Sequence, residues 1–474
     1  MSLSGAINSA AAGLLSTQIM SRVAADNVSN AMTDGYVRRE AVLISPSAGQ
    51  GGAIVSEVRR EVNTSLARLS RFENAKMTRY QAVNEGLKGY TSFLGQPGDG
   101  SSPADKFSNF QSSLTTLVNL PSSSGAQTAV VQTADDLAQT IRDAAGRLNT
   151  TLAEVDMEIR YAVTELNQAL YRLADLNVAQ RGYAPGSTEA IGNAEQTDLL
   201  LDQIAQYTDF RVSTSSNGII SLYTLSGAPL LEGDQVQDLT YNPGTGTLMA
   251  GTTDITPFKD GVRGMRAGAM VGLLELKRDV VPRYQLQLDE FARGLIQGFE
   301  TADASLTAGQ TGLFTDNGAA FDPLNLTGLA SRIRINEKVS LDGDAEVWRI
   351  RDGLEAVAPG DAADSTQIQQ FLDAFSNPLS AATETGIPPT VSLGDFAAEF
   401  VTYQATEASR AETNFFAASS SADIYMSARR NAEGVNIDEE MQRLLLIEQS
   451  YTANSRVLTT VTDMIDTLLA VVGR

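Results

Sequence analysis

The N-terminal thirty residues carry apolar or small side chains at alternating spacings of four and three. This spacing places them on one face of a helix and forms a heptad-like seam. The seam consists of Leu3, Ile7, Ala10, Leu14, Thr17, Ser21, Ala24 and Val28. Arg22 and Asp26 are the only charged residues of this stretch, whereas a solvated helix normally carries more charge on its outer face. We therefore predict a helix with protein neighbours on several sides.

The C-terminal segment repeats the same spacing. Its seam includes Leu444, Ile447, Tyr451, Leu458, Ile465 and Leu468. Asn436 lies just before the periodic region and is followed three positions later by Glu439, a spacing typical of a helix capping box. Acidic residues in the first turn also suit the positive end of a helix dipole. We therefore predict a second long helix, capped by Asn436 and Glu439.

The two terminal helices would bury little apolar surface if they packed only against each other. Many seam positions are small, and ordering the backbone of two long helices has a large entropic cost. Other copies of the chain are the expected source of further buried surface. We therefore predict ends that are poorly ordered in the monomer and helical in an assembly. The predicted self-assembly residues are Leu3, Ile7, Leu14, Val28, Leu444, Ile447, Tyr451, Leu458, Ile465 and Leu468.

A cluster of polar residues follows the first predicted helix and indicates a stop and a turn. It consists of Asn27, Asn30, Thr33, Gly35 and Tyr36. Asn27 and Asn30 fall in the final turn, where their amides can satisfy carbonyl groups left without a helical partner. Gly35 follows Asp34 and is expected to supply a positive φ. We expect Tyr36 to anchor the returning chain on the helix, and the arginines at 38 and 39 to face solvent.

The interior of the chain has mostly helical periodicity, interrupted by one region that alternates like β-strands. The longest helical pattern runs from Leu137 to Leu176, and a later one covers Leu393–Glu433. The alternating region contains Asn217-Gly218, a typical hairpin turn. We predict a mainly α fold: a long antiparallel helical bundle built from the N- and C-terminal halves, terminal coiled-coil rods, and a small inserted β domain.

This order of elements predicts four structural parts. The expected parts are a terminal rod domain (1–62 and 434–474), a long-helix bundle (63–208 with 265–315 and 390–433), an inserted β domain (209–264) and a mixed, irregular segment (316–389). The chain is expected to run outward and return, so that its two ends meet at one pole.

The composition argues against several functional classes. The chain has 35 Lys+Arg and 57 Asp+Glu, a net charge of −22, which disfavours binding to nucleic acid or to anionic membrane. No run approaches the roughly 20 apolar residues of a membrane span. The absence of His and Cys excludes a Ser-His-Asp triad, a disulfide and the usual zinc sites. We expect no enzymatic activity and no cofactor, metal or catalytic residue. The distant alternative is a carboxylate-dependent glycosidase, which would need a deep pocket with two carboxylates about 5–10 Å apart.

The two ends of the chain resemble one family. Asn27-x-x-Asn30-x-x-Thr33-x-Gly35-Tyr36 is similar to the N-terminal signature of bacterial flagellar axial proteins, which include rod, hook and hook-associated proteins. The family usually has Asn where this chain has Asp26, a small departure. The segment from Gly434 to Leu469 resembles the closing helix of the same families.

The interior indicates which branch of these axial proteins is most similar. The long helices, together with the segment from Arg266 to Thr315, resemble the helical block of the FlgK family of flagellar hook-associated proteins. Hook and rod proteins share the ends but lack this block. Another axial protein of hook or rod type is the nearer alternative, and it would require residues 63–207 to fold as something other than a long helical bundle.

The resemblance implies a structural role at the hook–filament junction. A family member is expected to self-assemble as a ring-like layer on the distal end of the hook and to connect the hook to the filament. Its expected partners are other copies of itself, the hook protein, a second junction protein, the filament, and an export chaperone at the C-terminal helix. The resemblance also implies an extracellular location, reached by type III export without a cleaved signal peptide.

Overall fold

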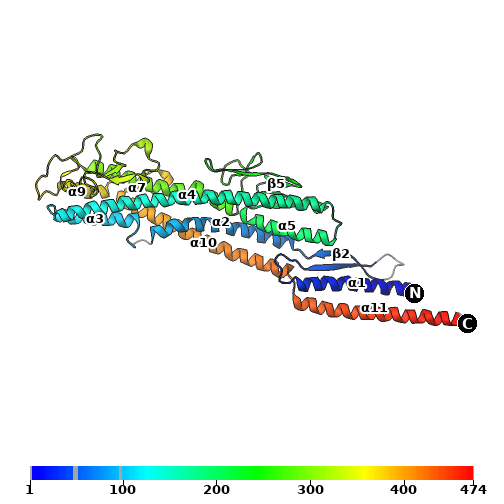
Figure 1. Cartoon of the computed structure of the whole chain (residues 1–474). Coiled ribbons are helices and arrows are strands. Elements are labelled where there is room, and N and C mark those ends of the chain that lie inside the picture. Colours follow the sequence, from blue (N-terminus) through cyan, green and yellow to red (C-terminus); the bar gives the residue numbers. More distant parts are fainter. Residues whose placement is uncertain (1–2, 46–51, 96–98, 473–474) are drawn as a thin grey trace.

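The computed structural model describes residues 3–45, 52–95 and 99–472. The molecule is elongated, with a thick helical body at one end and a thin pair of terminal helices at the other (Figure 1). The chain passes along the body and returns, so both termini lie at the thin end. The fold is mainly α, with small β-sheets on the body and beside the N-terminal helix.

Long helices form the body. α4 contains 57 residues, which corresponds to a length of roughly 85 Å. Serine side chains cap several of these helices, and Ser102 forms a complete capping box with Asp105. The helices of the body are α2 (Thr64–Leu94), α3 (Pro103–Asn119), α4 (Ser124–Gln180), α5 (Thr188–Tyr207), α6 (Ala269–Glu275), α7 (Val281–Ala302) and α10 (Leu393–Glu433), with a π-helical turn (Leu276–Val280) between α6 and α7.

A buried polar chain joins the N- and C-terminal halves of the body. The hydroxyl of Tyr90 donates to Oε1 of Gln404 at 2.8 Å. Nε2 of Gln404 donates to Oε1 of Gln287 at 2.7 Å, and Nε2 of Gln287 donates to the carbonyl of Thr385 at 2.7 Å. All four residues are fully buried. Because unpaired polar groups are costly in a core, this chain holds α2, α7 and α10 in one arrangement.

The inserted β region lies on α4. Nδ2 of Asn177, on α4, donates to the carbonyl of Ile220 at 2.8 Å. Oδ1 of Asn177 accepts from the N–H of Ile220 at 3.0 Å. The turn between the first two strands contains Gly218, whose φ is +80°. The first sheet has the order β3 (Arg211–Thr214), β4 (Ile220–Tyr223), β5 (Pro229–Glu232) and β6 (Gln235–Val236); the second has β7 (Leu239–Asn242), β8 (Thr247–Ala250) and β9 (Thr253–Asp254).

The segment between α7 and α10 packs at the far end of the body, opposite the termini. Its buried side chains join an aromatic cluster in which Phe299, Phe314, Phe371 and Phe375 meet Phe110 or one another at centroid distances of 5.3 to 5.7 Å. Its elements are β10 (Phe314–Asp316), β11 (Ile333–Ile335), α8 (Arg349–Asp352), α9 (Thr366–Asp373), β12 (Pro378–Ser380) and β13 (Thr390–Ser392), with short 3₁₀ turns at Pro323–Asn325, Leu329–Ser331, Ala374–Ser376 and Thr383–Thr385.

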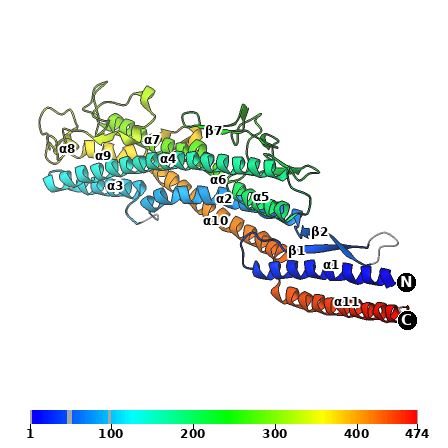
Figure 2. The same ribbon diagram turned by 45° about the vertical axis from the view of Figure 1, so that its right-hand side comes forward.

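The thin end consists of α1 (Leu3–Ser29), a hairpin of β1 (Arg39–Ile44) and β2 (Ile54–Arg60), and α11 (Ile437–Val472). α1 lies between the hairpin and α11, as both ribbon views show (Figure 2). The hairpin was not anticipated, since residues 1–62 were expected to form only a helical rod. The two terminal segments are also helical in the single chain, contrary to the expectation of poor order in the monomer. The hairpin gives α1 a second packing partner that the sequence argument had omitted.

None of the described helices is both long and apolar enough to cross a membrane.

Candidate assembly site

Small residues let the two terminal helices approach closely. A Cβ added to Gly13 would lie 2.6 Å from Nδ2 of Asn454, so a larger residue there would displace the Asn454 side chain. On its other side α1 meets the hairpin, where the Ser16 hydroxyl donates to the carbonyl of Ala53 at 2.7 Å. The low charge of α1 therefore reflects neighbours on two sides within the same chain.

The predicted seam residues differ in how far they are covered. Ala10, Thr17, Ala24, Ile447 and Val461 are buried. Tyr451 and Leu468 are 50% and 51% exposed, so pairing with α1 leaves them largely open to solvent. The half-buried members are Leu3, Ile7, Leu14, Val28, Leu444, Leu458 and Ile465.

A second row of apolar side chains on α11 flanks the face that α1 covers and stays exposed. It comprises Leu446, Val457 and Met464 together with the seam residue Leu468, and we call these four residues the outer stripe. These side chains are between 46% and 63% exposed in the single chain. Contiguous exposed apolar residues on a helix mark an interaction surface. Leu446, Val457 and Met464 were missed by the sequence analysis, although their spacing of seven to eleven residues was visible in it.

Asn27 fastens the end of α1 to the start of β1. Its Nδ2 donates to the carbonyl of Arg39 at 2.9 Å, and its Oδ1 accepts from the N–H of Arg39 at 3.0 Å. The side chain is fully buried. The prediction that Asn27 satisfies a carbonyl of the last helical turn is therefore wrong. A buried side-chain amide can pair with both the N–H and the C=O of one residue, and Arg39 at the start of β1 supplies both groups.

The remaining residues of the stop-and-turn motif shape the reversal itself. Nδ2 of Asn30 donates to the carbonyl of Asp26 at 2.8 Å, as expected for the final helical turn. Thr33 is exposed, and its hydroxyl reaches Oδ1 of Asn30 at 3.4 Å. Gly35 has a φ of +77°, and a Cβ there would lie 2.4 Å from Cδ2 of Leu199 on α5. The turn is thus packed against the body as well as against α1.

Tyr36 closes the motif. Its hydroxyl donates to Oδ1 of Asn27 at 2.9 Å, so Tyr36 does anchor the returning chain on α1. Burial raises the pKa of the Tyr36 phenol to about 12, with a smaller opposing contribution from Arg39. The Arg39 guanidinium lies 5.0 Å from the centre of the Tyr36 ring.

The expectation that Arg38 and Arg39 face solvent is wrong. Nε of Arg38 lies 2.8 Å from Oε1 of Glu440, in the first turn of α11. This hydrogen bond raises the pKa of the Arg38 guanidinium above its ordinary value. Arg39 forms a bidentate pair with Glu195 of α5 at 2.9 and 3.0 Å. The two arginines therefore tie the turn to α11 and to the body.

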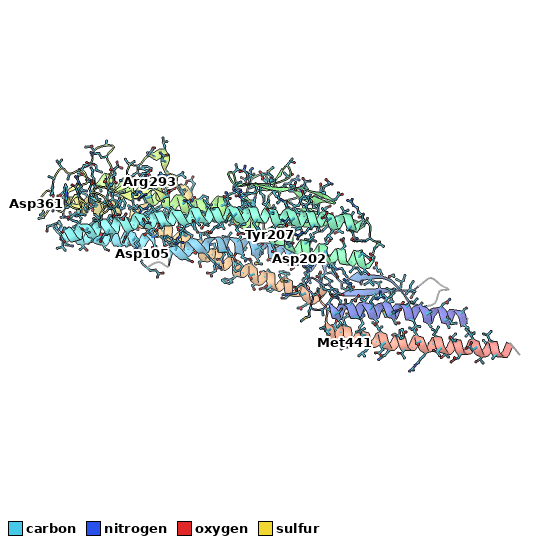
Figure 3. All side chains as sticks on the ribbon, viewed as in Figure 1. Asp105, Asp202, Tyr207, Arg293, Asp361 and Met441 are labelled. Atoms are coloured by element: carbon cyan, nitrogen blue, oxygen red, sulfur yellow. The ribbon has the colours of Figure 1, made fainter. Side chains whose placement is uncertain are left out.

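A network of ion pairs continues from this turn across the base of the body. Arg429, near the end of α10, pairs with Asp202 of α5 at 2.9 Å and with Glu433 at 2.9 Å. Asp202 also meets Arg71 of α2 at 2.6 Å. Arg71 and Arg60 both bind Asp198. Burial would raise the pKa of Asp198, but the two guanidinium groups outweigh it and lower the pKa. Figure 3 shows Asp202 at the point where the body narrows toward the terminal helices.

The start of α11 is capped from one side only. Oδ1 of Asn436 accepts from the N–H groups of Asp438 and Glu439 at 3.1 and 3.4 Å. Glu439 is exposed, and within the described residues its carboxylate does not return a bond to Asn436. The acidic residue of this turn that forms a buried contact is instead Glu440, which is 1% exposed and pairs with Arg38. The sequence does not identify Glu440 as the partner of Arg38, because Asp438, Glu439 and Glu440 are consecutive acidic residues in the same helical turn.

The arrangement contains features of a packing surface rather than of a reaction centre. Among the described residues, no group of three or more acidic side chains is placed to hold a metal ion. The site instead consists of a pair of helices with exposed apolar side chains on α11, and the ion pair of Arg38 with the buried Glu440 joins α11 to the turn after α1.

Two family models match the chain. The model described as the flagellar hook-associated protein FlgK helical domain matches residues 92–313. The model described as the flagellar basal body rod FlgEFG protein C-terminal matches residues 431–471. The first match covers much of the helical body and the inserted β region, and the second covers α11. Over these residues the chain is similar to the FlgK family of flagellar hook-associated proteins.

The chain is also similar to individual flagellar proteins. It is 23% identical over 493 residues to flagellar hook-associated protein 1 of Bacillus subtilis (strain 168), a match that covers 95% of this chain and 94% of the relative. It is also similar to a solved structure of the flagellar hook junction protein FlgK from Burkholderia pseudomallei, with 18% identity and a TM-score of 0.41. That match covers 54% of this chain and 47% of the solved chain.

Proposed function

We propose that this chain is a component of the hook–filament junction, which self-assembles on the distal end of the hook and connects the hook to the filament. Similarity to the FlgK helical domain and to a flagellar hook-associated protein supports a structural role in the flagellum. The observation that carries the assembly mechanism is the outer stripe of α11, which the single chain leaves open beside its own α1–α11 pair.

Assembly in this proposal proceeds through the thin end of the molecule. Both termini lie at this end (Figure 1). Packing of the outer stripe against a neighbouring copy would remove Leu446, Val457, Met464 and Leu468 from water. Complete burial of one such side chain stabilises an interface by roughly 1.5–3 kcal/mol. The same contact repeated around a ring produces a layer, because identical subunits with one head-to-tail contact close when their rotation permits it.

The proposed partners follow the family. The hook protein would contact one side of the layer, and a second junction protein and then the filament would contact the other. An export chaperone would cover the exposed apolar residues of α11 before secretion. The proposed location is the extracellular junction, reached by type III export without a cleaved signal peptide.

Removal of α1 and the turn motif tests this proposal. A chain that lacks residues 1–36 retains every helix of the body but loses the partner of α11. We expect the truncated protein to stay folded and monomeric in solution but to be absent from isolated hook-basal structures of a strain that depends on this chain, and the cells to be non-motile. Motile cells with filaments attached to hooks would refute the assembly role.

A further inference from the structure

A large cavity lies between the helical body and the inserted β region, away from the terminal helices. Its volume is about 850 Å³, within the usual range for ligand-binding pockets. The walls come from the beginning of α2, from α5, from the end of α4 and from β3. Figure 3 labels Asp202 and Tyr207 on α5, the helix that supplies one of these walls. The apolar lining includes Leu69, Phe72, Leu201, Phe210, Val212 and Leu225.

One border of the cavity is an edge strand. β3 pairs with β4 on one side and has no strand on the other in its sheet. All four residues of β3 are exposed, although their partners Ile220 and Leu222 on β4 are buried. An uncovered edge presents backbone N–H and C=O groups that can pair with an incoming extended segment.

Two buried side-chain atoms at the cavity lack hydrogen-bond partners within the described residues. Oδ1 of Asp209 accepts from the N–H groups of Arg266 and Ala267, but its Oδ2 has no partner. Arg60 binds Asp198 through Nη2, whereas its Nε has no partner. Asp209 is 2% exposed, and the Arg60 side chain is 9% exposed. Leaving such groups unpaired is costly. Both residues line the cavity, so one unpaired acceptor and one unpaired donor are buried in its wall.

The rim of the cavity carries unpaired positive charge. Arg68 and Arg211 line it and are exposed, and neither forms an ion pair in the part of the chain that the structure describes. Arg60 and Arg71 add two further guanidinium groups, partly neutralised by Asp198. In a chain with a net charge of −22, a local excess of arginine favours an acidic ligand.

We propose that this cavity binds an extended, acidic and apolar segment of another protein, which adds a strand to β3. The backbone of the segment pairs with the open edge of β3. Its apolar side chains enter the cavity against Phe72 and Val212, and its carboxylates meet Arg68 and Arg211. The site lies on the body, so it is separate from the proposed assembly surface of α11.

Peptide binding to the full-length chain tests the proposal. The probe is a fluorescein-labelled hexapeptide of alternating aspartate and valine, compared with the same peptide in which lysine replaces aspartate. We expect saturable binding, by fluorescence anisotropy, of the acidic peptide only. Arg68→Glu and Arg211→Glu are each expected to weaken binding of the acidic peptide by about tenfold or more, since each reverses a rim charge.

Arg172→Glu is the matched control, because Arg172 is exposed on α4, outside the cavity lining and without an ion pair in the described residues. Circular dichroism and thermal melting establish that the variants fold.

A second set of measurements distinguishes the backbone contact and the other occupants. The acidic peptide with N-methyl groups at alternate positions is expected not to bind, and bound unmethylated peptide is expected to slow amide exchange in β3. Absence of saturable peptide binding, or equal binding of the acidic and basic peptides, would overturn the proposal. So would decanoate binding that depends on Arg68 and Arg211 without peptide binding, which would identify a small-molecule pocket. Sedimentation that shows self-association abolished by Arg211→Glu, again without peptide binding, would assign the cavity to a second copy.

Discussion

Arg38 and Glu440 form an ion pair across 402 positions of the sequence, with Nε of Arg38 lying 2.8 Å from Oε1 of Glu440. Glu440 is buried and Arg38 is about one-quarter exposed. The pair joins the chain just after α1 to the first turn of α11, and the N–H of Arg38 also donates to the carbonyl of Glu433 at the end of α10. The direction in which α11 leaves the body therefore depends on this contact.

Arg38→Met is expected to loosen the start of α11. The substitution leaves the carboxylate of Glu440 buried without its cation, and the other oxygen of that carboxylate already lacks a partner among the described residues. We expect a loss of about 2 kcal/mol or more in local stability, measured by amide hydrogen exchange in residues 437–447. The double variant with Glu440→Gln is expected to recover part of it.

The matched control for Arg38→Met is Arg59→Met. Arg59 pairs with Glu61, but both side chains are substantially exposed, and such pairs contribute about 0–1 kcal/mol. Equal effects of the two substitutions would contradict the role assigned to the buried pair.

Asn27→Ala is expected to separate the hairpin from α1. It removes three hydrogen bonds and leaves the peptide groups of Arg39 without their partner. A loss of about 2–4 kcal/mol is expected, seen as faster amide exchange in β1. Asn30→Ala removes a less buried bond to the helix backbone and is expected to cost less than about 1 kcal/mol. A larger effect at Asn30 than at Asn27 would reverse this assignment.

Gly35→Ala separates two requirements of the turn. Gly35 and Gly100 have nearly the same φ, +77° and +78°, but a Cβ at Gly100 would meet nothing within 4 Å. Alanine at Gly100 is therefore expected to cost about 1 kcal/mol from backbone strain alone. Alanine at Gly35 is expected to cost more in thermal or chemical unfolding, because it also displaces Leu199. Similar costs at both sites would mean that the packing against α5 is unimportant.

Val457→Asp tests the outer stripe. Val457 is 46% exposed and Val461, one turn later, is 7% exposed. We expect Val457→Asp to change the unfolding free energy by less than about 0.5 kcal/mol and to prevent incorporation into isolated hook-basal structures. Val461→Asp is expected to destabilise the α1–α11 pair in the soluble protein itself.

Thr452→Asp provides the control for Val457→Asp, because it adds the same charge at an exposed position of α11 outside the seam and the outer stripe. It is expected to assemble normally. Loss of incorporation with Thr452→Asp as well would indicate a general effect of charge rather than a specific surface.

Tyr36 is expected to give the turn a dependence on high pH. Its pKa is raised from 10.0 to about 12, mainly by burial, so the folded protein favours the neutral phenol. The stabilisation is complete below pH 10 and is lost as the pH rises toward 12. Ultraviolet difference titration of the wild type and of Tyr36→Phe measures this transition. A Tyr36 signal that titrates at pH 10 would show that the side chain is not shielded.

The local elements of this protein were largely determined by the sequence. The spacing of apolar residues predicts α4 and α10, because helical period depends on residues close together in the sequence. Gly35 predicts a turn, because glycine adopts a positive φ without strain. The open outer stripe of α11 also lies in the one-dimensional pattern, although recognising it as separate from the seam required knowing which face α1 covers.

The tertiary structure decided which polar residues meet. Asn27 could pair with its own helix or with β1, Arg38 could face solvent or Glu440, and any of three successive acids could have been the buried one. These choices depend on contacts between residues up to hundreds of positions apart, and their energies depend on burial that only the packed chain creates. The same holds for the cavity beside β3, whose walls come from four separate elements. Local sequence therefore specified the helices and turns. Tertiary packing specified which polar and charged side chains pair between them and which strand edge borders the cavity.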